Sequence, residues 1–273
     1  MNAEDKRKDI ISQQRIFTKG YRTNDPCRSP FISDQTQKIP SPAAVKNPVT
    51  PEANWFYLTR DFSNLSVRND LTAVLRDRHS CRIFTEEPIS AEQLSFLLWA
   101  TQGIKKIRTK SNVRTVPSAG GRHEFETYLI LRNVEGLKPG AYHYLPVEHA
   151  LEYLHEIKDI ERVISDSLFN QPWTGNAAAI FYWAMIPYRA EWRYSIYAHR
   201  MALMDAGHIC QNLYIASTGL SLGCCAVASL EHEQCCEIFS LDGEEEYVVY
   251  AAPVGNIRDV DKEENPMFYF ECN

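Results

Sequence analysis

The sequence predicts an α+β protein in which a sheet packs against helical layers, preceded by a proline-rich arm. Three observations lead to this prediction. Segments with helical and strand-like patterns are intermixed along the chain without strict βαβ alternation. Several apolar runs have the length of buried strands. The 273 residues suffice for one substantial hydrophobic core, so we expect one domain over 71–273 and an arm over 1–70.

The arm is set apart by a proline-rich stretch over 28–56, with prolines at positions 30, 40, 42, 48 and 51. Proline fixes φ and removes a backbone donor, so we expect an extended and irregular segment. It is either a loose leader or is laid along another surface. The apolar residues 55–58 favour docking at its C-terminal end.

Helices are predicted at three places after the arm. Apolar residues at 71, 74 and 75 define one face of a helix over 71–78. Ser90 and Gln93 form a capping box for a second helix, which stops at Gly103. The longest helical pattern covers 199–219.

Strands are predicted from short apolar runs bounded by turn residues. Turns at Gly136 and Pro146 join the first three of them. The run over 177–186 is apolar throughout, which indicates a strand covered on both faces. The predicted strands are 126–131, 140–145, 150–154, 177–186, 223–230 and 247–255.

Composition excludes several classes of protein. The chain has 29 basic and 35 acidic residues, a formal charge of −6, and a duplex nucleic-acid binder would need a basic face. No apolar stretch approaches the roughly 20 residues that cross a bilayer. The N-terminus lacks the apolar core of a signal peptide. We therefore expect a cytoplasmic protein.

The eight cysteines include two adjacent pairs, at 224–225 and 235–236. None has the C-x-x-C spacing of a zinc knuckle or a thioredoxin-type motif. We expect them to be small apolar residues of the core, and we expect no metal site.

Residues 78–84, RHSCRIF, support two interpretations. Cations at a helix C-terminus are stabilised by its dipole, which accounts for Arg76 and Arg78 but not for Arg82. In an extended segment, by contrast, Arg78, Ser80 and Arg82 would lie on one side. Two guanidiniums and a hydroxyl suit a phosphate. The residues alone leave both interpretations open.

Three other features admit a functional or a structural interpretation. The loop in RTVPSAGGRHEFETY, residues 114–128, would let the backbone approach a flat ligand, or is a plain connecting turn. A predicted strand ends at Gly255, and Arg258 follows it. This arginine either belongs to a functional group of residues at the strand end or is simply solvated. His208 is interpreted as a hydrogen-bonded core residue. Because the chain contains no P-loop, dinucleotide fingerprint or nucleophile elbow, a prosthetic group is the expected source of reactivity.

Taken together, these segments resemble the FMN-dependent nitroreductase superfamily, and within it the SagB-type dehydrogenase branch. The matching segments include RHSCRIFTEEPISAEQLSFLLWATQGI, RTVPSAGGRHEFETYLILRNV, MALMDAGHICQNLYIASTGLSLG and SLDGEEEYVVYAAPVG. They stand in the family's order over residues 78–255, about two-thirds of the chain. The pairing of R-x-S-x-R-x-F with P-S-A-G carries most of the resemblance.

The resemblance implies a nitroreductase-like fold with a mostly antiparallel central sheet, in an intertwined homodimer with FMN at the subunit interface. Residues 78–82 would hold the phosphate and ribityl chain, and residues 117–120 would lie beside the isoalloxazine of the partner's site. The arm would wrap the other subunit. The cofactor-binding residues implied in this way are Arg78, His79, Ser80, Arg82, Pro117, Ser118, Ala119, Gly120, Ala228, Ser229, Gly255 and Arg258, with Lys262 as a substitute for the last.

Two departures from the family pattern bear on chemistry. A Lys-Tyr pair of peptide-azoline dehydrogenases is replaced here by Arg193-Tyr194, our candidate catalytic residues. Arginine is not deprotonated in proteins, so Arg193 cannot act as a general base, but it could orient an anionic substrate or stabilise reduced flavin. Ala228 stands where the family usually has glycine.

The function implied is hydride transfer via flavin N5 to or from a small or planar organic substrate, with NAD(P)H as a donor. Two alternatives stay open: a SagB-like azoline/peptide dehydrogenase and a non-catalytic flavin-binding protein.

Overall fold

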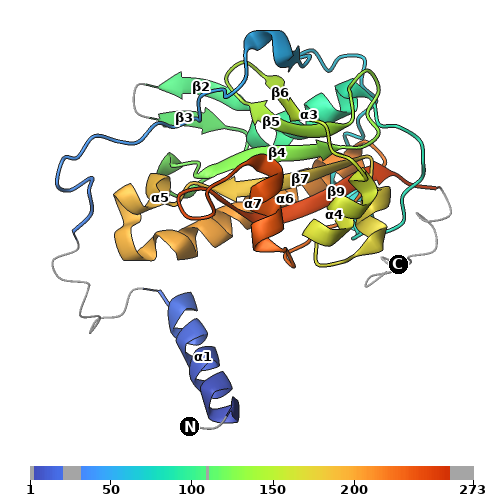
Figure 1. Ribbon diagram of the computed structural model, residues 1–273. Helices are drawn as coiled ribbons and strands as arrows, with labels where there is room; N and C mark the ends of the chain where they lie inside the picture. Colours follow the sequence, from blue (N-terminus) through green and yellow to red (C-terminus); the bar gives the residue numbers. More distant parts are fainter. Residues whose placement is uncertain (1–2, 21–31, 109–110, 259–273) are drawn as a thin grey trace.

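The computed structural model describes residues 3–20, 32–108 and 111–258. Its centre is a seven-stranded sheet in which all neighbouring strands run antiparallel, with strand order β1-β6-β5-β4-β7-β9-β8 (Figure 1). The strands are β1 (Trp55–Tyr57), β4 (Phe125–Leu131), β5 (Gly140–Leu145), β6 (Ala150–His155), β7 (Ala179–Met185), β8 (Leu222–Cys224) and β9 (Tyr247–Asn256). A separate hairpin consists of β2 (Ile104–Arg108) and β3 (Ser111–Arg114).

Helices cover both faces of this sheet. One layer contains α3 and α6, whose apolar residues pack with one face of β4, β7 and β9, and α4 and α7 pack on the opposite face. The helices are α1 (Ala3–Thr18), α2 (Leu71–Asp77), α3 (Ala91–Gln102), α4 (Ile160–Ser167), α5 (Pro187–Tyr194), α6 (Ala198–Gly219) and α7 (His232–Phe239). The short 3-10 helices are η1 (Glu52–Asn54), η2 (Ala119–Gly121), η3 (Pro172–Asn176) and η4 (Ser195–Tyr197). The predicted α+β class with a flanked antiparallel sheet is confirmed.

Local sequence explains where the site-bearing elements begin. The side chain of Asp70 accepts the N–H of Ala73 and starts α2, and Ser90 and Gln93 form the predicted capping box of α3. Strand β7 is buried at every residue, as its continuous apolar run requires, because α3–α6 and α4–α7 cover its two faces.

The strand predicted over 223–230 is shorter in the structure, because β8 ends at Cys224. Its pairing with β9 nevertheless continues as far as residue 227: the N–H of Cys225 donates to Pro253 O (3.3 Å), and Val227 forms an isolated bridge with Ala251. Between them, the N–H of Ala226 donates to the hydroxyl of Tyr214 on α6 (2.7 Å). Residues 228–230 follow without strand structure.

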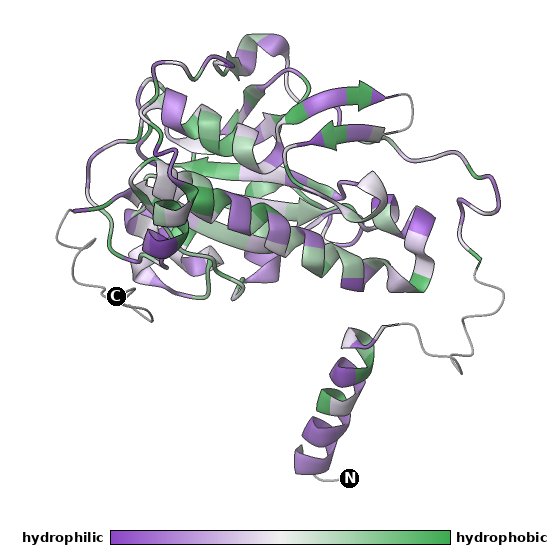
Figure 2. Ribbon diagram, turned by 180° about the vertical axis from the view of Figure 1, so that it is seen from behind, coloured by the Kyte–Doolittle hydropathy of each residue, from purple (hydrophilic) through white to green (hydrophobic). Residues whose placement is uncertain are grey.

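The arm differs from the expected irregular segment at both ends. Residues 3–18 form α1, which stands apart from the sheet (Figure 1) and is mostly hydrophilic (Figure 2). Its sequence is rich in strong helix formers and contains no proline. At the other end, β1 pairs with β6 of the same chain. Between α1 and β1, the arm forms two hydrogen bonds with Trp192. The backbone carbonyl of Trp192 accepts the N–H of Gln35 (2.9 Å), and its indole N–H donates to Ile39 O (2.9 Å).

Residues 33–58 therefore pack on their own chain, and the arm around the other subunit that the resemblance implied stays a prediction. None of the helices in the described ranges is long and apolar enough to cross a membrane. The cytoplasmic location stays a prediction.

Candidate functional site

Residues 78–84 are fixed between the end of α2 and the edge of the sheet. The N–H of Cys81 donates to Cys224 O (2.9 Å), and the N–H of Thr85 donates to Asn256 O (2.8 Å). These bonds hold the segment against β8 and β9. Cys81 is buried, while Ser80 and Arg82 on either side of it are exposed, as expected for an extended segment.

Aromatic rings support the two arginines of this segment. The guanidinium carbon of Arg78 lies 5.3 Å from the centroid of Tyr214, and that of Arg82 lies 5.8 Å from the centroid of Trp173. Ser80 Oγ is 2.9 Å from the hydroxyl of Tyr214. Within the described ranges, neither arginine forms an ion pair with a carboxylate. Their donors face an aromatic surface and solvent, which is how an anion site presents them.

His79, Gly255 and Arg258 have other surroundings. The ring of His79 is half-buried, with Nδ1 2.9 Å from Asp77 O at the end of α2. Gly255 is buried, and a Cβ there would lie 3.1 Å from Phe84 Cδ1, so this glycine makes room for the segment 78–84. Arg258 is exposed just beyond β9, and Lys262 lies outside the described residues.

Ala228 and Ser229 lie in the exposed loop between β8 and α7. They follow the isolated bridge of Val227 with Ala251 at the edge of the sheet. The structure thus places Ala228 and Ser229 on the loop that begins next to Tyr214, because the N–H of Ala226 in this loop donates to the Tyr214 hydroxyl.

A second group of predicted residues gathers around the loop 117–121. Pro117 and Gly120 are exposed, and Gly120 has a positive φ of 59°. A Cβ on Gly120 would lie 2.6 Å from the hydroxyl of Tyr194 and 2.7 Å from Cδ of Arg193. The structure therefore brings the P-S-A-G loop together with both candidate catalytic residues, although more than 70 residues separate them in the sequence.

The end of α5 presents Arg193 and Tyr194 to this loop. Both side chains are half-buried, and the guanidinium carbon of Arg193 lies 5.7 Å from the ring centroid of Tyr194. The next residue, Ser195, has φ 47° and ψ −126°, a conformation that costs a non-glycine residue energy. Strained residues of this kind are concentrated at functional sites.

Two acidic residues that sequence reasoning missed complete the second group. Asp205 Oδ2 accepts the N–H of Ala119 (2.7 Å), and Glu124 Oε2 lies 3.5 Å from Ser118 Oγ. Burial and the charge of Asp205 raise the pKa of Glu124 to about 7, and burial raises the pKa of Asp205. An acidic residue inside the apolar pattern of 199–219 was the available signal for Asp205.

Helix α6 links the two groups but keeps them apart. Tyr214 supports Arg78 and Ser80, and Asp205 supports the loop 117–121. The two residues are nine positions apart on one helix, which corresponds to about 14 Å at 1.5 Å per residue. One chain therefore carries two half-sites at different levels of the same helix.

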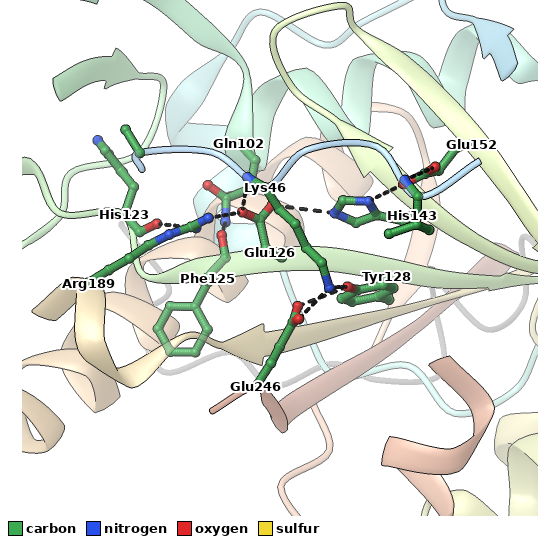
Figure 3. Close-up of polar contacts among 12 residues, drawn as sticks. Lys46, Gln102, His123, Phe125, Glu126, Tyr128, His143, Glu152, Arg189 and Glu246 are labelled. Carbon is green, nitrogen blue, oxygen red and sulfur yellow. Dashed lines mark hydrogen bonds and ion pairs between the residues drawn. The ribbon is translucent and has the colours of Figure 1, made fainter. Parts of the chain in front are cut away.

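A third polar cluster, also missed, lies under the arm (Figure 3). The carboxylate of Glu126 pairs with Arg189 (2.6 Å) and accepts the backbone N–H of Lys46 (3.0 Å). His143 lies between Glu126 and Glu152, with Nδ1 2.7 Å from Glu152. All four side chains of Glu126, Arg189, His143 and Glu152 are almost fully buried. Because this cluster is closed to solvent and binds the backbone of the arm at Lys46, we regard it as structural.

No disulfide joins the six cysteines in the described ranges, and burial raises the pKa of Cys210 and of Cys235 to about 12. Such thiols are poor nucleophiles. No group of three or more metal-binding side chains occurs among the residues that the structure describes.

Comparison with known proteins gives a consistent result. Residues 75–256 match the model of the Nitroreductase family. A candidate nitroreductase of Methanocaldococcus jannaschii is 29% identical over 185 residues, 68% of this chain and 90% of the relative. The crystal structure of a candidate nitroreductase from Ralstonia eutropha aligns with TM-score 0.63 and 24% identity, covering 80% of this chain and 97% of the other. The Escherichia coli microcin synthetase McbBCD complex with truncated pro-MccB17 aligns with TM-score 0.56 and 18% identity, covering 92% and 93%.

The fold is therefore the nitroreductase-like α+β class, shared with both solved structures. The family match covers well over half of the chain, including both half-sites. The chain belongs to the Nitroreductase family, a family of oxidoreductases, and this confirms the resemblance of its sequence.

Proposed function

We propose that this chain is an FMN-dependent oxidoreductase that transfers a hydride via flavin N5 to or from a small or planar organic substrate, with NAD(P)H as a donor. The observation that carries the proposal is the pair of guanidiniums at Arg78 and Arg82, held by aromatic rings beside the Ser80 hydroxyl. In the described part of the chain, no carboxylate competes for either arginine.

The residues present fit FMN. A terminal phosphate needs charge-assisted donors of fixed geometry, which two arginine forks and a hydroxyl supply. A flat ring system needs an exposed loop with small side chains, and the exposed Gly120 provides such a position in the loop 117–121. Segment 78–84 and loop 117–121 thus meet the requirements of the two ends of the cofactor.

Each half-site has its own task in this proposal. Arg78, Ser80 and Arg82 bind the phosphate end. Bound FMN would supply the hydride chemistry. Arg193 places a positive charge beside Gly120, which favours an anionic substrate or developing negative charge. The hydroxyl of Tyr194 is a neutral donor at the same position.

We further propose a homodimer in which each cofactor is bound by both chains. The support is the separation of the two half-sites along α6, together with apolar side chains left exposed on neighbouring helices. Leu203 and Met204 on α6 are 53% and 45% exposed, and Leu71 and Leu75 on α2 are 61% and 52% exposed. A cavity of about 500 Å³ lies between α2, α3 and α6. A second copy packed on this surface would cover the apolar residues and would complete each site.

The first test is the absorbance spectrum of the purified protein, followed by titration with FMN. Removing Arg82 (Arg82→Ala) should weaken FMN binding about 10- to 100-fold, the usual effect of losing a charged hydrogen bond. Arg76→Ala is the matched control, because Arg76 is paired with Asp77 outside the half-site. A colourless protein that stays so after FMN is added would sink the proposal. Light scattering during size exclusion tests the dimer.

Two alternatives have separate tests. Turnover of a thiazoline peptide to the thiazole, lost on Tyr194→Phe, would favour an azoline/peptide dehydrogenase. Bound flavin that no physiological donor reduces under anaerobic conditions would favour a non-catalytic flavin-binding protein. Tyr194 is the informative residue because its hydroxyl lies next to Gly120.

A further inference from the structure

Two buried carboxyl groups lie directly against the loop 117–121. Glu124 is 1% exposed and Asp205 is 3% exposed. Asp205 Oδ2 accepts the N–H of Ala119 (2.7 Å), so it fixes the loop backbone from the side of α6. Glu124 interacts with Asp205 and lies 3.5 Å from Ser118 Oγ, which in turn accepts the N–H of His123 (2.9 Å). The pair is therefore part of the support of the loop.

The second observation is an unsatisfied atom. Glu124 Oε1 is buried, and within the described ranges it has no hydrogen-bond partner. Two carboxylates in contact repel each other in a buried site, whereas one shared proton replaces the repulsion by a short O–H···O⁻ bond. Asp205 already accepts the N–H of Ala119, whereas among the described residues Glu124 Oε1 has no donor, so we assign the proton to Glu124. Burial and the nearby Asp205 raise the pKa of this carboxyl.

We propose that Glu124 and Asp205 share one proton, and that this acid–carboxylate pair positions the backbone of residues 118–121 for the isoalloxazine. Glu124 is thus a positioning residue that acts through Ser118 and Asp205. The choice of ligand rests on the proposed function, but the shared proton does not. Release of the proton leaves two negative charges behind the loop, which push Asp205 away from the Ala119 N–H and lower affinity for an electron-rich flavin.

Other charged and titratable groups surround the pair. His123 has its pKa lowered to about 3 by burial and by Arg114, so it stays neutral near pH 7. His208 is exposed and is not the core residue that its sequence context suggested: its side chain is 52% exposed, with Nδ1 3.7 Å from Asp205 Oδ1. Its substitution therefore serves as a control. The charged and titratable groups near the pair include Arg114 on β3, Arg122 and His123 after the loop, Glu126 on β4, Arg189, Arg193 and Tyr194 on α5, and His208 on α6.

The test is FMN affinity between about pH 6 and about pH 9, measured by flavin fluorescence. The affinity of the unmodified protein should fall about tenfold over this range, equivalent to one pKa unit of coupling. Glu124→Gln should keep the high affinity throughout, because its amide N–H replaces the shared proton as donor to Asp205. His208→Gln should leave the pH dependence in place. The same pH dependence in Glu124→Gln as in the unmodified protein, or its loss in His208→Gln, would overturn the proposal.

A second measurement tests for the shared proton in the absence of flavin. Infrared spectra of the apoprotein should contain the carbonyl band of a protonated carboxyl at about pH 6, lost by about pH 9 and absent in Glu124→Gln. Failure to bind FMN at any pH would end the proposed function, yet this band would still report on the pair. A folded protein without the band at about pH 6 would overturn the shared proton.

Discussion

Gly120 and Gly121 offer a matched pair of substitutions beside the candidate catalytic residues. Both have left-handed backbones, with φ 59° and 63°. Alanine in this region costs about 1–2 kcal/mol more than glycine, so Gly120→Ala and Gly121→Ala should lose similar stability. Any difference between the two variants then reports on what the new methyl group touches.

Only the methyl group at position 120 meets other atoms. It would lie 2.6 Å from the Tyr194 hydroxyl and 2.7 Å from Cδ of Arg193, whereas nothing lies within 4 Å of a Cβ on Gly121. Non-bonded heavy atoms prefer about 3.5–4.0 Å, so both side chains must move by about 1 Å. They are flexible and half-buried, so the movement adds little to the stability loss. A misplacement of about 1 Å can nonetheless cost about 100-fold in rate.

Urea unfolding and the anaerobic rate of flavin reduction separate these effects. We expect equal shifts of the unfolding midpoint for both variants, and about a 100-fold slower reduction for Gly120→Ala alone. Equal losses of rate in both variants would refute the reasoning, because backbone strain would then explain the loss without Arg193 or Tyr194.

Three further predictions concern stability, of which the first two are measured by urea unfolding and the third by acid unfolding. Asp70→Ala should cost about 1 kcal/mol, because the side chain caps α2 (3.1 Å to the N–H of Ala73); an unchanged midpoint would contradict this role. Arg189→Met should cost about 3–5 kcal/mol, since it leaves the buried carboxylate of Glu126 without its cation; a loss below about 1 kcal/mol would show that the ion pair is dispensable. Despite burial, Arg189 and His143 lower the pKa of Glu126, so its contribution is present above the usual glutamate pKa of about 4.3 and is lost as the pH falls below it. Acid unfolding that is unchanged in Arg189→Met would argue against this assignment.

Local signals predicted the elements that they control. The Ser90–Gln93 capping box marks the start of α3, and the alternation of turn and apolar residues gives β5 its bounds of 140–145. The helix α1 was missed because it is mostly hydrophilic and packs on no other element of the described chain that would give it an apolar face. Periodicity reports burial against a partner, so it gives no signal where a helix has none.

Some residues of the candidate site could be predicted from the sequence and others could not, depending on how far apart they are in the chain. Arg78, Ser80 and Arg82 are close in sequence, so their common side follows from an extended backbone. The contact between Gly120 and Tyr194, and the pairing of Glu124 with Asp205, join residues more than 70 positions apart and depend on how α5 and α6 pack. No pattern along the chain encodes such contacts. The cluster of Glu126, Arg189 and His143 was missed for this reason also.

Helix α6 fixes the spacing between the two half-sites, because Asp205 and Tyr214 both lie on it. Because an α-helix turns by about 100° and rises 1.5 Å per residue, one inserted or deleted residue between Asp205 and Tyr214 would swing one half-site out of line with the other. Surface loops can lengthen or shorten without such an effect. The number of residues along this stretch of helix is therefore constrained by both half-sites at once, whereas the length of a surface loop is not.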